Sequence, residues 1–63
     1  MEILDKKIKN AENDYISLEK AGAPTDVLKL QKIYIEILKE AKSKKKDYIW
    51  ASAKFNLITK DII

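Results

Sequence analysis

Apolar residues recur along this chain at alternating steps of three and four, and one short interruption, Gly22-Ala23-Pro24, divides the pattern. Such a seam, with a mean period of about 3.5 residues, allows helices to pack lengthwise against one another. The sequence therefore predicts an all-α fold, while specifying no chemistry. The seam consists of Leu4, Ile8, Ala11, Tyr15 and Leu18 before the interruption, and of Leu30, Tyr34, Ile37, Ala41, Tyr48, Ala51, Phe55, Ile58 and Ile62 after it.

The interruption predicts a turn between two helices. Residues 2–21 form the expected first helix, because the seam crosses them without a glycine or proline. Gly22 can take the left-handed conformation that ends many helices, and Pro24 cannot continue one. Thr25 or Asp26 then offers a side-chain oxygen as the N-cap of the next helix. A turn confined to residues 22–25 makes the following helix an antiparallel neighbour of the first.

The second half of the chain has two interpretations. No glycine or proline compels a break between residues 26 and 62, so an antiparallel helical hairpin with one long second helix is preferred. That helix would be about 57 Å long, and its far half would extend beyond the first helix. The alternative is a three-helix bundle in which the chain turns near residues 43–47. The seam lapses at Lys44, and Ser43 or Asp47 could cap a third helix.

Size and composition favour association with another protein. The chain has 63 residues and contains neither cysteine nor histidine, so disulfides and the usual soft metal ligands are absent. A core this small rarely supplies more than about 5 kcal/mol. We therefore expect a protein partner or a homo-oligomer, and we expect no cofactor or metal.

Enzymatic activity is not expected. Without histidine and cysteine the familiar base–nucleophile pairs cannot form, and a single glycine cannot build a phosphate-binding loop. Glu36 and Glu40 lie one helical turn apart, but with lysines nearby they are interpreted as a solvent-facing pair. The sequence therefore predicts a non-enzymatic protein without a small-molecule substrate.

Positive charge is concentrated in the second half. The net charge is +3, and residues 32–63 carry eight lysines and four acidic residues, whereas residues 1–31 carry five and six. All 13 basic residues are lysines, which lack the planar fork that reads guanine edges. An alternative function is therefore weak, sequence-nonspecific nucleic-acid binding. Its candidate residues are Lys42, Lys44, Lys45, Lys46 and Lys54.

The preferred function is that of a protein–protein interaction module, which self-associates or docks helix on helix on a partner as a regulator, inhibitor, adaptor or co-chaperone. Residues 26–41 carry more apolar side chains than one neighbouring helix could cover. A membrane-surface role is disfavoured, because acidic residues are interspersed throughout. The N-terminus carries no secretory signal, so a cytoplasmic location is expected. The predicted partner-binding residues are Leu30, Tyr34, Ile37, Tyr48, Trp50, Phe55 and Ile58.

Overall fold

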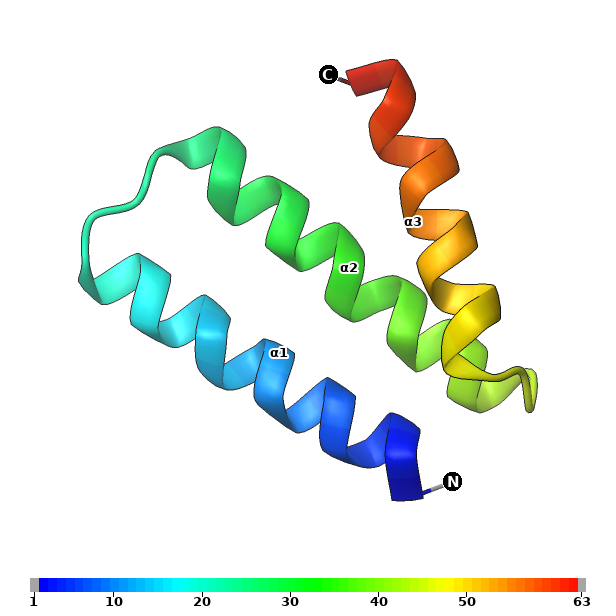
Figure 1. Cartoon of the computed structure of the whole chain (residues 1–63). Coiled ribbons are helices and arrows are strands. Elements are labelled where there is room, and N and C mark those ends of the chain that lie inside the picture. Colours follow the sequence, from blue (N-terminus) through cyan, green and yellow to red (C-terminus); the bar gives the residue numbers. More distant parts are fainter. Residues whose placement is uncertain (1, 63) are drawn as a thin grey trace.

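Three α-helices follow one another in the computed structural model, and each runs antiparallel to the one before it (Figure 1). They are α1 (Glu2–Lys20), α2 (Thr25–Ser43) and α3 (Tyr48–Ile62). The structure describes the backbone of residues 2–62 and the side chains of residues 3–60, so the side chain predicted for the seam at Ile62 lies outside the described residues. The all-α class is confirmed, and the described residues form no strand.

The chain turns between α2 and α3. The preferred prediction of one continuous helix over residues 26–62 is therefore wrong, and its alternative, a break near residues 43–47, is confirmed. The N–H of Lys46 donates to the carbonyl of Ala41 at 2.7 Å, and the N–H of Lys45 donates to that of Lys42 at 3.2 Å. These two bonds form a Schellman motif, which ends α2 with Lys45 in the left-handed conformation at φ 57°. A lysine thus occupies the position that glycine usually takes.

Helix α3 begins with the side-chain cap that the sequence indicated. Asp47 Oδ1 accepts a hydrogen bond from the N–H of Trp50 at 2.8 Å, which satisfies one of the free donors at the start of the helix. The turn therefore combines a left-handed stop at Lys45 with a capping aspartate two residues later. No glycine or proline is needed for it.

The first turn uses the same backbone motif with the expected residue. Gly22 lies at φ 76°, and the N–H of Ala23 donates to the carbonyl of Leu18 at 3.0 Å. The predicted cap of α2 by Thr25 or Asp26 is wrong. Helix α2 already begins at Thr25, so Pro24 occupies the N-cap position, and its side chain has no atom that could accept a hydrogen bond. The carbonyl of Pro24 accepts the N–H groups of Val27 and Leu28.

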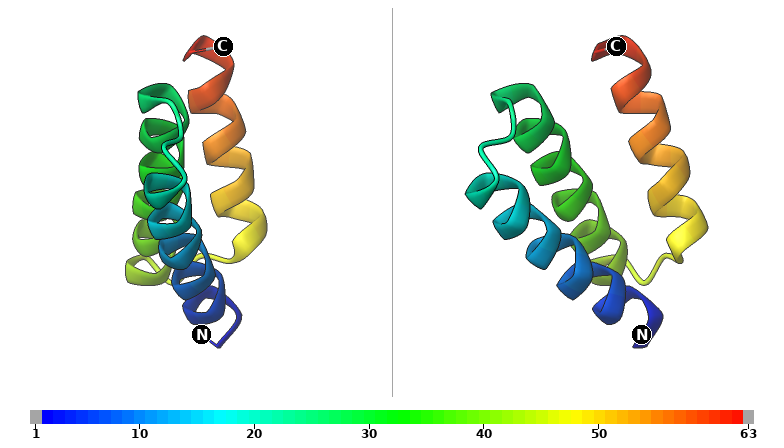
Figure 2. Two further views of the ribbon diagram at one scale, coloured as in Figure 1. Left: turned by 90° about the vertical axis from the view of Figure 1, so that its left-hand side faces the viewer. Right: turned by 60° about the vertical axis from the view of Figure 1, so that its left-hand side comes forward.

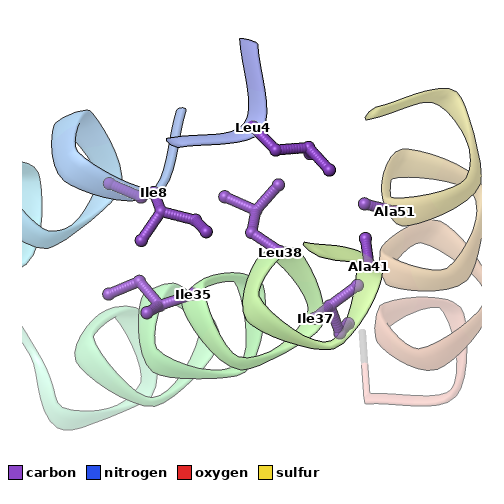
Figure 3. Packing of buried hydrophobic residues seen from close by; sticks show 8 residues of the cluster. Leu4, Ile8, Ile35, Ile37, Leu38, Ala41 and Ala51 are labelled. Atoms are coloured by element: carbon purple, nitrogen blue, oxygen red, sulfur yellow. The ribbon is translucent and has the colours of Figure 1, made fainter. Parts of the chain in front are cut away.

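Helix α2 is the central element of the core. Figure 3 shows Leu38 of α2 beneath Leu4 of α1 and Ile35 of α2 beneath Ile8, whereas Ala41 of α2 faces Ala51 of α3. Leu38, Ala41 and Ala51 are completely buried. Because α2 is packed from two sides, it also buries Ile35 and Leu38, which lie outside the predicted seam. The buried hydrophobic residues are Leu4, Ile8, Ala11, Ile35, Ile37, Leu38, Ala41 and Ala51.

The bundle is flat rather than closed. Its principal dimensions are 34 × 26 × 13 Å, and the two views in Figure 2 show α3 standing away from the pair formed by α1 and α2. Helices α1 and α3 approach each other at the end where α2 finishes, since Leu4 and Ala51 belong to the same core cluster. A flattened bundle leaves much of α3 accessible from outside.

Replacing Lys45 with glycine should increase the free energy of unfolding by about 1 kcal/mol, because glycine adopts positive φ without the steric cost of a Cβ atom. Lys46→Gly is the matched control. It leaves Lys45 in its strained conformation and increases the freedom of the unfolded chain, so it should not stabilise. Urea unfolding measures both variants, and equal effects would contradict the left-handed conformation at Lys45.

Candidate partner-binding surface

Helix α3 is apolar on two sides. Only Lys54, Lys60 and Asp61 carry charge among its 15 residues. One side packs on α2 through Ala51, with Phe55 and Ile58 against the same core. The buried hydroxyl of Thr59 on this side donates to the carbonyl of Phe55 at 2.9 Å, so its burial leaves no unpaired group.

The outward side of α3 carries a second apolar row. Ile49, Ala53 and Leu57 are spaced by four residues, so they lie one above the other on the helix surface. All three are exposed, Ile49 to 75% and Leu57 to 70%. We call these three residues the outer ridge. A helix with two apolar sides is ordinarily covered on both, whereas here the outer ridge faces solvent.

The shape of the outer ridge suits contact with another helix. Rows of residues four apart form the ridges that fit into grooves between the side chains of a packed neighbour. The small side chain of Ala53, between two larger ones, lets a neighbouring backbone come close at the centre of the row. Trp50 borders the outer ridge, because it lies three residues before Ala53 and seven before Leu57. Its half-buried ring lies under Lys54, whose Nζ is 5.0 Å from the ring centroid.

Most of the residues predicted to bind a partner face inward instead. Ile37 is 5% exposed and belongs to the core. The ring of Tyr34 meets that of Phe55 edge to face, with centroids 5.1 Å apart and planes at 68°. Leu30 and Ile58 are half-buried. Helix α3 therefore covers the apolar side of α2 that α1 leaves open. Of the residues predicted to bind a partner, Trp50 is the one that borders the outer ridge.

Tyr34 and Tyr48 join the three helices where they converge. The Tyr34 hydroxyl donates to that of Tyr48 at 3.2 Å, and Lys7 Nζ of α1 lies 4.6 Å from the Tyr48 ring centroid. Burial, together with this hydrogen bond, raises the pKa of Tyr34 to about 12. The same hydrogen bond, received from Tyr34, holds the pKa of Tyr48 below its ordinary value, with a smaller contribution from Ser52. The two hydroxyls bond to each other within the bundle, so this pair serves packing between the helices and is not an open binding site.

The five lysines predicted to contact nucleic acid differ in their surroundings. Lys54 and Lys44 both pair with Glu40, the second at 3.9 Å, and Lys42 pairs with Asp5. The hydrogen bond from Lys54 is the main reason why the pKa of Glu40 lies below its ordinary range. Lys42 lowers the pKa of Asp5 in the same way. Lys45 and Lys46 form no ion pair with any carboxylate that the structure describes.

The outer ridge was not among the predicted site residues. Its sequence signal is the four-residue spacing of Ile49, Ala53 and Leu57, beside a seam that already runs through Tyr48, Ala51 and Phe55. The spacing identifies an exposed row only once it is known that the seam side of α3, with Ala51 and Phe55, packs on α2. In a continuous helix either side could meet another chain.

Within residues 3–60 no group of three or more acidic residues is arranged to hold a metal ion. None of the three described helices is long and apolar enough to cross a membrane. Comparisons of the chain with protein-family models, with curated proteins and with solved structures found no match. The outer ridge is therefore interpreted from its own geometry.

Replacing Glu40 with glutamine should lower the free energy of unfolding at neutral pH, because the variant loses the carboxylate that accepts from Lys54 and pairs with Lys44. The folded-state pKa of Glu40 lies below the ordinary value of 4.5. Its contribution is therefore present above the unfolded-state pKa and is lost as the pH falls through the folded-state pKa. Urea midpoints of the wild type and the variant should differ at neutral pH and converge in acid.

The control for this experiment is Glu36→Gln, one turn earlier on α2, because Glu36 forms no ion pair among the described side chains. It should cost less stability at neutral pH than Glu40→Gln. A gap between wild type and Glu40→Gln that persists unchanged in strong acid would contradict the ion-pair explanation.

Proposed function

We propose that this chain is a small, non-enzymatic protein–protein interaction module of the cytoplasm, and that the outer ridge of α3 docks on a helix of a protein partner. The observation that carries the proposal is the exposure of Ile49 and Leu57, 75% and 70%, on a helix whose other side already packs on α2. Covering one large aliphatic side chain contributes about 1.5–3 kcal/mol. Covering both therefore contributes about 3–6 kcal/mol before the cost of association.

The form of the exposed surface supports a helix as the element that covers it. The outer ridge is a single narrow row, whereas a helix that lies in a membrane surface needs a broad apolar face. In α3 the broad face is the one buried against α2. Roles that fit such docking are those of a regulator, an inhibitor, an adaptor or a co-chaperone of the partner.

A partner other than a second copy is favoured by the size of the outer ridge. A stable dimer buries about 800 Å² on each chain, and three side chains on one helix, one of them alanine, fall well short of that area. A larger protein can surround the outer ridge with further contacts. The nucleic-acid alternative would leave Ile49 and Leu57 in water, so the exposed row gives it no support.

Site-specific photocrosslinking in the source cells tests this proposal. A diazirine analogue of leucine at Leu57 should give one discrete protein adduct. The same analogue at Asn13, an exposed position on α1, should give none. Adding Ile49→Ser should remove the adduct, because docking then loses one of the two large side chains of the outer ridge.

Circular dichroism should show unchanged helix content in the Ile49→Ser variant, since that side chain is already exposed in the free chain. Absence of an adduct at position 57, or an adduct that survives Ile49→Ser, would contradict docking through the outer ridge.

A further inference from the structure

The connection between α2 and α3 is short and strained. It consists of residues 44–47, and Lys45 within it adopts the left-handed conformation at φ 57°. A lysine carries a steric cost in this conformation that a glycine would avoid. Short connections under strain favour the exchange of a flanking element between two copies of a chain, because the exchange lets the connection straighten.

The apolar seam keeps its phase across this connection. Steps that alternate between three and four residues lead from Ala41 through Lys44 to Tyr48 and on to Ala51. A turn does not require such continuity, because the helices before and after it can meet at any phase. A continuous helix does require it, since an unbroken period of 3.5 residues keeps one side facing the same neighbour along the whole length. The sequence across the turn therefore also suits a helix.

The contacts between α2 and α3 can form between two copies as well as within one. Within one chain Ala41 faces Ala51 (Figure 3). If two chains straighten at the turn, their long helices can lie antiparallel, with α3 of each copy on α2 of the other. In the register that keeps Ala41 opposite Ala51, the apolar seam residues again lie opposite one another, and Lys44 falls opposite Tyr48. The stem of a lysine can cover a tyrosine ring while its ammonium group stays in water.

We propose that two copies of this chain exchange α3 and form a dimer, in which residues 25–62 of each copy make one long helix. Helix α1 stays on α2 of its own copy, and each α3 packs on α2 of the other copy. The exchange preserves the apolar contacts of the single chain and relieves the strained conformation of Lys45 in both copies. It makes no use of the outer ridge, so it goes beyond the proposed function and is independent of it.

The charged residues beside the seam both support and oppose this dimer. Lys54 of one copy reaches Glu40 of the other, because the exchange preserves the ion pair of the single chain. At the centre of the dimer the two copies of Lys45 approach each other along one edge of the seam, and the two copies of Asp47 along the other. Both are pairs of like charges. Added salt screens these exposed repulsions and should therefore favour the dimer.

The single chain prevails at low concentration. The short connection holds α3 beside its own α2 at an effective concentration in the millimolar range, as expected for linked elements. A second copy competes with this closure only when its own concentration is comparable, so the dimer should become measurable at roughly 1 mM of chain. Strain in the turn lowers the concentration that is needed.

Glycine and alanine at position 45 test the exchange, because the two variants carry the same charge and differ only in the Cβ atom. Lys45→Gly relaxes the turn and weakens the long helix, whereas Lys45→Ala keeps the steric cost in the turn and strengthens the helix. Each chain should contribute about tenfold, so the alanine variant should dimerise about a hundredfold more tightly in sedimentation equilibrium. The same two substitutions at Lys29, which is helical in both forms, are the control and should give equal association constants.

Spin labels at Lys29→Cys and Lys60→Cys identify the form of the dimer, since the chain has no cysteine of its own. Labelled Lys45→Ala chains diluted into unlabelled ones report the distance within one copy. In one long helix the two labelled positions are about 46 Å apart. The longest dimension of the single chain is 34 Å. The dimer should therefore give a distance longer than any that the monomer can give.

Four results would overturn the exchange. They are the absence of a Lys45→Ala dimer at about 1 mM of chain, equal association constants for the glycine and alanine variants, a dimer with only the short distance within each copy, and a dimer that Leu57→Ser abolishes. The last result would assign self-association to the outer ridge. A dimer that shows the long distance and persists in Leu57→Ser supports the exchange of α3.

Discussion

The reversal of the chain at Lys45 determines which apolar side chains of α2 and α3 are buried in the core and which remain exposed to solvent. A non-glycine residue in the left-handed conformation carries a steric cost of about 1–2 kcal/mol. The turn therefore depends on what α3 gains by lying on α2. Those gains include the contact of Ala41 with Ala51 (Figure 3) and the edge-to-face packing of Tyr34 on Phe55. If the turn straightened into helix, one side of α2 and one side of α3 would both lose their cover.

Contacts at the edges of the α2–α3 interface hold α3 in one position along α2. Lys54 reaches Glu40 on one side, and the Tyr34 and Tyr48 hydroxyls meet on the other. Lys7 of α1 lies over the Tyr48 ring, so the first helix takes part as well. Exposed ion pairs contribute little individually. Their effect here is to select one register of an apolar interface, and that register determines which residues of α3 face outward.

The two turns differ in how far the sequence could predict them. Gly22 marked the first turn, because glycine alone adopts positive φ without steric cost, and the positions of Leu4, Ile8 and Ala11 in the core followed from the seam. The second turn could not be decided from local signals, because lysine is a good helix former and no glycine occurs there. The packing of α3 on α2 decides it.

The same packing explains why the candidate site was only partly predicted. Tyr34 and Ile37 were predicted to face a partner because α2 carries more apolar side chains than α1 could cover, but α3 of the same chain covers them, and Phe55 of α3 packs there as well. The outer ridge is what remains exposed after α3 has packed. A pattern of side chains along the sequence shows that a helix has two apolar sides, but it does not show which side the rest of the chain will cover.

Nuclear Overhauser contacts between the rings of Tyr34 and Phe55 test whether α3 folds back on its own α2. A mixture of isotope-labelled and unlabelled chains distinguishes contacts within one chain from contacts between chains. Ring contacts within single chains are expected, and they should persist on dilution. Ring contacts found only between chains would show that residues 26–62 pair with another copy, and would contradict the three-helix arrangement on which the outer ridge depends.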